Sequence, residues 1–118
     1  MIETLRNAVA EADARIIVRN PSAIAELCGP LPLESPRDNA EWLTIGEEGK
    51  PHIHLRSSDV ARLRFDAPLD GNVALEVLDE DGARVLRVAF VKTNPAKNDC
   101  DQRRRSALID RYGARRGA

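Results

Sequence analysis

Two short apolar runs separated by an acidic turn constrain the fold of this chain most. Residues 72–78 and 84–91 are rich in valine, leucine and alanine, and Asp79-Glu80-Asp81-Gly82 stands between them. An Asp-Gly pair between two such runs is typical of a β-hairpin, because glycine readily adopts the positive φ that a tight turn requires. The second half of the chain is therefore predicted to form antiparallel β-sheet.

Other segments extend this pattern. Further strands are predicted where short runs alternate or are β-branched, at residues 15–19, 41–45, 52–56 and 60–65. Residues 22–28 suit a helix or a strand. Apolar residues at three- and four-residue spacing predict a helix over residues 2–12, and a final helix is predicted from about 101 to 112, ending at Gly113.

Together these segments predict one α+β domain over residues 1–118. Its antiparallel sheet has about six or more strands, flanked by N- and C-terminal helices. A composition of 42% hydrophobic and 31% charged residues is ordinary for a globular domain of 118 residues. No apolar run approaches the roughly 20 residues of a membrane span, so no membrane association is expected.

The beginning of the chain and its cysteines indicate the compartment. Residues 1–5 lack a basic region followed by an apolar run, which predicts no signal peptide and a cytoplasmic protein. Cys28 and Cys100 have no metal-binding spacing and are expected to be free thiols. Cys28 is expected to be buried and Cys100 to lie in a loop.

Charge is unevenly distributed along the chain. The net charge is −1, yet residues 101–118 carry six arginines against two aspartates. These arginines could bind an acidic partner, or could form the solvated end of a helix whose dipole favours cations there. Since the chain has four aromatic residues in all, it offers no platform for stacking bases, and nucleic acid is not an expected partner.

The candidate binding residues centre on His52 and His54, the two histidines of the chain. Residues at i and i+2 of a strand point to the same face, so both imidazoles and Arg56 should project together. Imidazole is a frequent ligand of haem iron and other metals, and arginine binds carboxylates. Arg62 and Arg64 on the next strand could share this face.

Two alternatives stand beside a ligand site. The His-x-His segment could be the solvated face of an amphipathic strand. A zinc site would need a third ligand, and no cysteine, aspartate or glutamate is evidently placed to supply one, so none is expected. There is no glycine-rich phosphate loop and no recognisable nucleophile motif, which gives an enzyme little support.

The chain resembles the HemS/ChuS/ChuX/HutX haem-utilisation family in an ordered series of short elements between about residues 15 and 91. The matching elements are residues 18–31, with Asn20-Pro21, then Trp42-Leu43, His54-Leu55-Arg56, Val60-Ala61, residues 74–79 and Asp81-Gly82. The length is that of the single-repeat, ChuX-like type. One departure is Leu27, which stands where the family's hairpin carries a histidine.

This resemblance implies a homodimer with extended antiparallel sheets that carries haem in the cytoplasm. His54 or His52 would bind the haem iron, and Arg56, Arg62 and Arg64 would be candidate partners of the propionates. Two alternatives remain. The chain could be a non-enzymatic structural or interaction module that has lost haem binding, or it could degrade haem, as the resemblance also allows.

Overall fold

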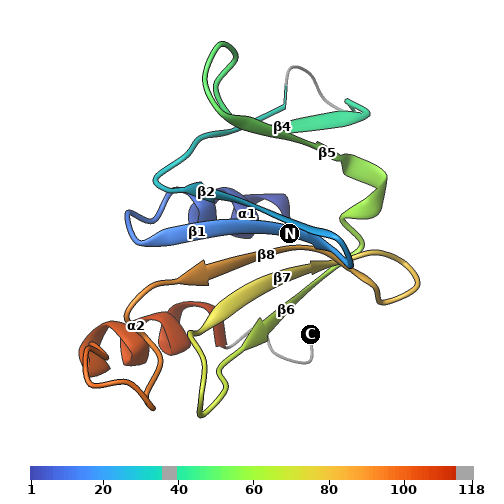
Figure 1. The fold of residues 1–118 in the computed structure, drawn as a ribbon. Helices are drawn as coiled ribbons and strands as arrows, with labels where there is room; N and C mark the ends of the chain where they lie inside the picture. The colour runs from blue at the N-terminus through green and yellow to red at the C-terminus, as the bar shows by residue number, and fades with distance from the viewer. Residues whose placement is uncertain (36–39, 114–118) are drawn as a thin grey trace.

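The computed structural model describes residues 1–35 and 40–113 (Figure 1). In chain order its elements are α1 (Ile2–Val9), β1 (Ala14–Asn20), β2 (Ala23–Cys28), β3 (Leu33–Glu34), β4 (Trp42–Gly46), β5 (His52–Arg56), the 3₁₀ turn η1 (Ser57–Asp59), β6 (Arg62–Asp66), β7 (Ala74–Leu78), β8 (Arg84–Phe90) and α2 (Gln102–Tyr112). The described strands form two antiparallel sheets, a five-stranded one ordered β2-β1-β8-β7-β6 and a three-stranded one ordered β3-β4-β5. The predicted α+β class is confirmed, with the strands divided between two sheets.

The predicted hairpin is formed by β7 and β8. In its turn, Asp79 Oδ1 accepts hydrogen bonds from the backbone N–H groups of Asp81 and Ala83, each at 2.9 Å. Gly82 has a φ of 82°, which a residue with a side chain rarely adopts. The acidic residue and the glycine therefore act together to reverse the chain.

The ambiguous residues 22–28 form a strand, β2, at the edge of the larger sheet. The Asn20 side chain accepts a hydrogen bond from the Ser22 N–H at 2.8 Å, which tightens the turn from β1. Cys28 is a free thiol but is exposed, so the expectation of a buried Cys28 is wrong. Cys28 lies at the end of the edge strand β2, where it pairs with Arg15 of β1. Nothing in the described chain covers the Cys28 side chain.

The strands β5 and β6 follow one another in the sequence but lie in different sheets. The turn η1 redirects the chain between them, and β6 pairs with β7, placing Arg64 opposite Glu76. The expectation that Arg62 and Arg64 share a face with the histidines is therefore wrong.

One hydrophobic cluster joins both sheets and both helices. The helix α1 contacts β1 and β3, and its Leu5 and Val9 are fully buried, as is Leu108 of α2. Phe90 at the end of β8 stacks on Tyr112, with ring centroids 5.9 Å apart. This continuous core holds the smaller sheet against the larger one, so the surface of the smaller sheet has a fixed support.

The arginines of α2 attach this helix to the start of the chain. Arg104 donates to both carboxylate oxygens of Asp13 at 2.7 and 2.8 Å, and Glu11 accepts from Arg111 and from the Tyr112 hydroxyl. The hydrogen bonds from Arg104 lower the pKa of Asp13. Burial raises the pKa of Tyr112, with help from Glu11, to about 12.

Several of the C-terminal arginines are thus structural contacts and not a free basic surface. Arg105 is also buried, and its guanidinium donates to the Thr93 carbonyl at 2.9 Å. Arg115 and Arg116 lie outside the described residues. None of the helices in the described part of the chain combines the length and the apolarity that a bilayer span requires.

Candidate metal centre

The hairpin of β4 and β5 places the two histidines on its outer face. Ile45 pairs with Ile53 and Leu43 with Leu55, and these side chains point into the core. Successive side chains of a strand point to opposite faces, so the residues that alternate with these four, including His52 and His54, point outward. His52 and His54 consequently stand together on the outer face, with ring centroids 4.8 Å apart.

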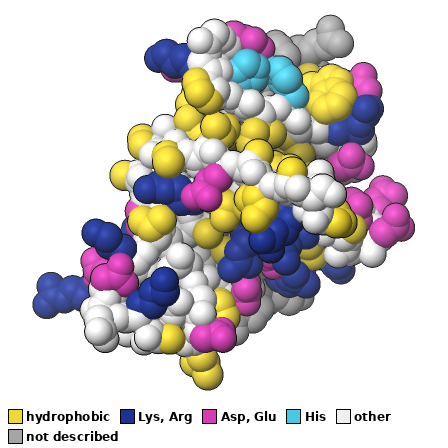
Figure 2. Space-filling model, in the orientation of Figure 1, with side chains coloured by type: hydrophobic (Ala, Val, Ile, Leu, Met, Phe, Trp, Pro, Cys, Tyr) yellow, Lys and Arg dark blue, Asp and Glu magenta, His cyan; other side chains and the backbone are white. Residues whose placement is uncertain are grey.

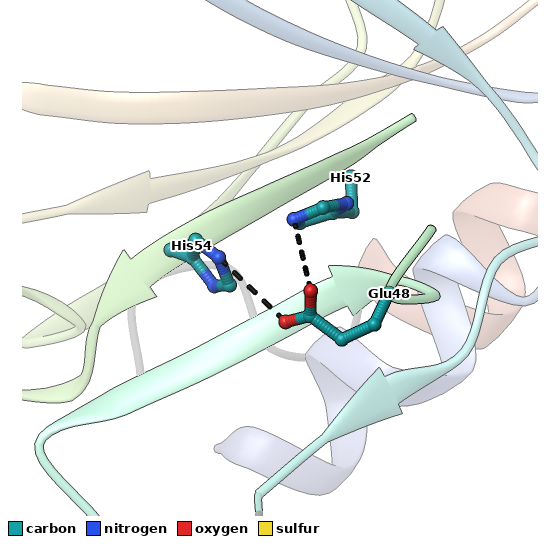
Figure 3. Close-up of side chains that lie close together, drawn as sticks. All are labelled: Glu48, His52 and His54. Carbon is teal, nitrogen blue, oxygen red and sulfur yellow. Dashed lines mark ion pairs between the residues drawn. The ribbon is translucent and has the colours of Figure 1, made fainter. Parts of the chain in front are cut away.

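The turn of this hairpin brings a carboxylate to the same place. Glu48 extends over the strand so that its Oε2 lies 3.7 Å from His52 Nε2 and its Oε1 lies 3.9 Å from His54 Nε2 (Figure 3). The ligand atoms of the three residues all lie within 4.8 Å of one another. The turn that carries Glu48 is bounded by Gly46 and Gly49, which have φ values of 105° and 82°.

The other nitrogen of each imidazole is already held. His52 Nδ1 lies 2.5 Å from the Lys50 carbonyl oxygen, which can only accept, so Nδ1 carries the proton. His54 Nδ1 lies 3.1 Å from Thr44 Oγ1, directly across the strand pair. The carbonyl partner of His52 leaves its Nε2 lone pair facing Glu48, and the Nε2 of His54 faces the same carboxylate. A second hydrogen bond of this kind orients most metal-binding histidines.

Imidazole nitrogen and carboxylate oxygen are both ligand types of zinc, and here they lie close together on one face. Bonds from zinc to histidine and carboxylate are about 2.0–2.2 Å long, which puts neighbouring ligand atoms of a tetrahedral site about 3.3–3.6 Å apart. The observed 3.7 and 3.9 Å end on different oxygens of Glu48, and the three ligand atoms lie within 4.8 Å of one another, so the side chains would rotate inward to bind one ion. Three protein ligands leave at least one coordination position open.

An open hollow of about 440 Å³ adjoins the centre and is lined by Trp42, Thr44, Glu48 and His54. Figure 2 shows the histidines on the surface of this part of the molecule. Arg56, at the far end of the same face, lies over the Trp42 ring at 4.4 Å from its centroid. Its guanidinium also donates to Glu41 at 2.5 Å, so this predicted ligand-binding cation is held by neighbours on its own hairpin.

The structure therefore brings together only part of the predicted set. His52 and His54 meet, and Arg56 shares their face. Arg62 and Arg64 lie on the other sheet. The expectation that no acidic residue could supply a third ligand is wrong, because the turn between β4 and β5 places Glu48 beside both histidines. The signal was a glutamate four residues before His52, between two glycines that let the turn fold back.

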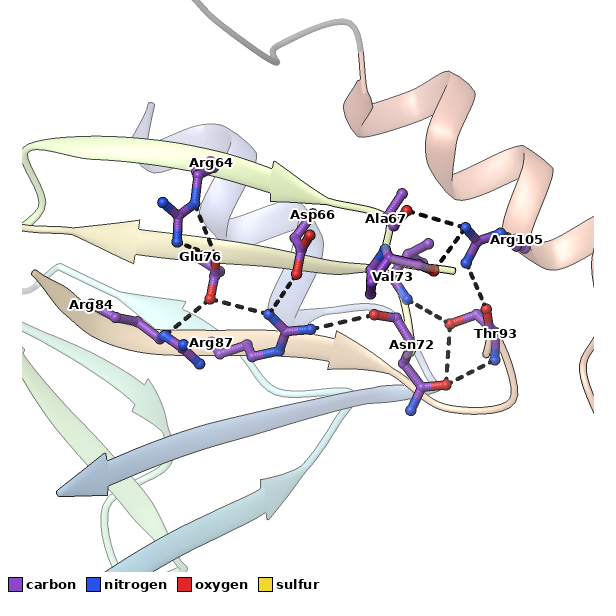
Figure 4. Close-up of polar contacts among 11 residues, drawn as sticks. Arg64, Asp66, Ala67, Asn72, Val73, Glu76, Arg84, Arg87, Thr93 and Arg105 are labelled. Atoms are coloured by element: carbon purple, nitrogen blue, oxygen red, sulfur yellow. Dashed lines mark hydrogen bonds and ion pairs between the residues drawn. The ribbon is translucent and has the colours of Figure 1, made fainter. Parts of the chain in front are cut away.

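Arg64 belongs instead to a network around a buried carboxylate (Figure 4). Glu76 is 2% exposed and accepts hydrogen bonds from Arg64 at 2.8 and 3.0 Å and from Arg87 at 3.1 Å. Arg84 Nε lies 3.0 Å from it. Burial raises the pKa of Glu76, but the arginines outweigh burial and its net pKa is lowered. This network braces the outer face of the larger sheet.

A second polar network closes the loops beside β7 and β8 (Figure 4). Thr93 is fully buried, and its hydroxyl oxygen accepts from the Val73 N–H at 3.0 Å and donates to the Phe90 carbonyl at 2.6 Å. The Asn72 side chain accepts from the Thr93 N–H at 3.1 Å. Each of these polar groups has a partner, which assigns the cluster a structural role.

Comparison with known proteins places the chain in a family without giving it a function. No curated protein matches the chain. The model of one protein family, which is itself uncharacterised, matches residues 3–112. Nothing in this match links the chain to the haem-utilisation proteins, so that resemblance stays a prediction. Because the match spans nearly all of the chain, the protein belongs to this uncharacterised family.

Proposed function

We propose that the protein binds a divalent transition-metal ion of the zinc type through His52, His54 and Glu48. The observation that carries the proposal is the convergence of both Nε2 atoms on one carboxylate, while both Nδ1 atoms are held by oxygen atoms on the opposite side of each ring.

The ligand set indicates which ions fit. Two imidazoles and one carboxylate suit zinc, iron(II), cobalt and nickel, whereas calcium and magnesium prefer oxygen ligands. Structural zinc sites have four protein ligands, but this site has three and is partly open, with His54 49% exposed. An open surface site suits an exchangeable ion, which favours a role in holding or passing on metal.

Haem remains the second candidate. What favours it is the position of His54 beside the exposed Trp42 ring, with a hollow between strands and turn in which a flat ligand could lie. A porphyrin needs a largely apolar slot, and here the Glu48 carboxylate and the Thr44 hydroxyl stand at the imidazoles. These surroundings fit a hydrated ion better than a porphyrin.

The experiment is a calorimetric titration of the full chain with zinc chloride, repeated for His54→Ala and Glu48→Gln. We expect one ion per chain and a loss of affinity of at least about 100-fold in His54→Ala, because even the loss of a group that only orients a metal ligand costs about 10- to 100-fold. The matched control is Glu47→Gln, which alters the neighbouring glutamate, whose partner is Lys50.

Cobalt(II) provides a second readout, since its visible absorption reports the number and geometry of ligands. Unchanged zinc affinity in both site variants, or no zinc binding by the parent chain, would refute the proposal. A parallel hemin titration separates the candidates: a saturable Soret shift that disappears in His54→Ala supports haem. If neither ligand binds, the remaining interpretation is an interaction module without a cofactor.

A further inference from the structure

We propose that a second site, on the outer face of the five-stranded sheet, binds a small anion that carries an apolar body. The site is a hollow of about 630 Å³ where β2, β1 and β8 run side by side. It lies on a different sheet from the metal centre and is independent of it. Its volume falls in the range of small-molecule sites, roughly 300–1,000 Å³.

The floor of this anion site is apolar. Ile17 in the middle of β1, Ile24 on the edge strand and Val85 on β8 all line it. Ile24 is 58% exposed, a large fraction for an isoleucine. On the outer face of a sheet, three branched aliphatic side chains in one hollow provide the surface that an aliphatic or aromatic body would cover.

The rim of the anion site is cationic. Arg19, Arg84 and Arg87 line the hollow, against the single lining carboxylate of Glu26. The Arg19 side chain has no hydrogen bond or ion pair with another described residue, and Arg19 stands opposite Ile24 in the strand pairing. The charged and apolar parts of the site are therefore adjacent. Figure 2 likewise shows lysine and arginine side chains grouped beside hydrophobic ones below the histidines.

The positive charge of this rim is only partly neutralised from within. Arg84 and Arg87 share the Glu76 carboxylate with Arg64, so three guanidinium groups surround one carboxylate, and Asp66 adds a second contact to Arg87. Both arginines are held in place by these contacts. A cation that is already positioned loses less side-chain entropy when it binds an anion.

These features favour a small ligand over a nucleic acid or a second protein. The acidic turn at Asp79–Asp81 directly precedes the strand that bears Arg84 and Arg87, and it would repel a long polyanion lying across the sheet. A guanidinium group pairs well with a carboxylate or a sulfonate head. The expected ligand is therefore an amphipathic monoanion, such as a medium-chain carboxylate.

The test uses anilinonaphthalene sulfonate, a fluorescent anion with an apolar body, titrated into the full chain in the presence of EDTA. We expect saturable binding at one site, displacement by decanoate, and little displacement by decanol. Loss of the Arg19 contact should weaken dye and decanoate binding about tenfold in Arg19→Gln, which corresponds to about 1.4 kcal/mol. Ile24→Ser should weaken both ligands as well.

The control variant is Arg103→Gln, which removes an exposed arginine of α2 and should bind as the parent does. Unfolding curves of all variants establish that the dye reports the folded protein. Equal affinities in the parent, Arg19→Gln and Ile24→Ser would overturn the proposal, as would equal displacement by decanol. Dye binding that falls as the protein dimerises in light scattering would also overturn it, because a second copy would then cover the face.

Discussion

Glu76 should contribute more to stability than any other carboxylate of the larger sheet, and Glu76→Gln tests this. The substitution keeps the size of the side chain and one acceptor oxygen but removes the charge. Arg64, Arg84 and Arg87 then face one another without the carboxylate that they share. A cluster of like charges beside a buried neutral amide is unfavourable, because burial increases the strength of the repulsion.

The magnitude follows from how exposed each partner is. Arg64 and Arg84 are 55% and 47% exposed, so solvent screens them and each contact is worth at most about 0.5–1 kcal/mol. Arg87 is 18% exposed, and its hydrogen bond to the buried Glu76 carboxylate should contribute about 1.5 kcal/mol to stability. We expect Glu76→Gln to lower the free energy of unfolding by about 2–3 kcal/mol, or the melting temperature by about 10 °C.

The assay is urea unfolding followed by far-ultraviolet circular dichroism at pH 7 and at decreasing pH. The pKa of Glu76 is lower in the folded state than its usual 4.5. Its stabilisation is therefore complete well above pH 4.5 and is lost as the pH falls through the folded pKa. The difference between the parent and Glu76→Gln should shrink over that range. Asp66→Asn, which removes a single contact with Arg87, is the control and should cost less than 1 kcal/mol.

Two results would refute this reasoning. One is a Glu76→Gln protein as stable as the parent at pH 7, which would mean that desolvation of the carboxylate cancels its attraction to the arginines. The other is a difference that stays constant into acid, which would mean that a change in packing, and not the lost charge, causes the effect.

Three further predictions concern other parts of the fold. The pKa of Tyr112 is raised to about 12, against 10 in an unfolded chain. The contribution of Tyr112 to the free energy of unfolding should therefore be complete below pH 10 and fall by about 3 kcal/mol as the pH rises from 10 to 12. Urea unfolding of Tyr112→Phe should lack this pH-dependent loss. Asp101 caps α2 by accepting from the Arg104 N–H at 3.0 Å, so Asp101→Ala should cost about 1 kcal/mol in thermal unfolding, and Asp101→Ser should restore most of it. Gly46 has a φ of 105°, and an added Cβ there would lie 2.8 Å from the Pro51 carbonyl oxygen. Gly46→Ala should therefore distort the turn and weaken zinc binding, measured by calorimetry, at least tenfold. Gly49→Ala, where a Cβ has open space, should weaken zinc binding less.

Many local elements of this fold could be predicted from the sequence. The β7–β8 hairpin follows from an Asp-Gly turn between apolar runs. The helix α2 begins after Asp101 and ends before Gly113, as the sequence indicates. The alternation of residues 52–56 correctly places Leu55 in the core and both histidines outside. Each of these features depends on residues a few positions apart, and such short-range patterns are visible in a single sequence.

The sequence did not reveal how the strands are shared between sheets. Alternation in residues 60–65 predicts a strand but not its partner, and β6 pairs with β7 and not with β5. The separation of Arg62 and Arg64 from the histidines follows from that choice. Strand partners are selected by the packing of the whole core, which no local pattern contains.

The candidate metal centre shows the same division. The sequence by itself determined that His52 and His54 share one face, because a strand alternates with a period of two. Only the tertiary structure decided that Glu48 completes the group, because the path of a turn depends on its φ angles and on the strands that it joins. The arginines near the C-terminus are a second case. Their number is evident in the sequence, but their pairing with Glu11 and Asp13, about 90 to 100 residues away, exists only once the core has brought the two ends of the domain together.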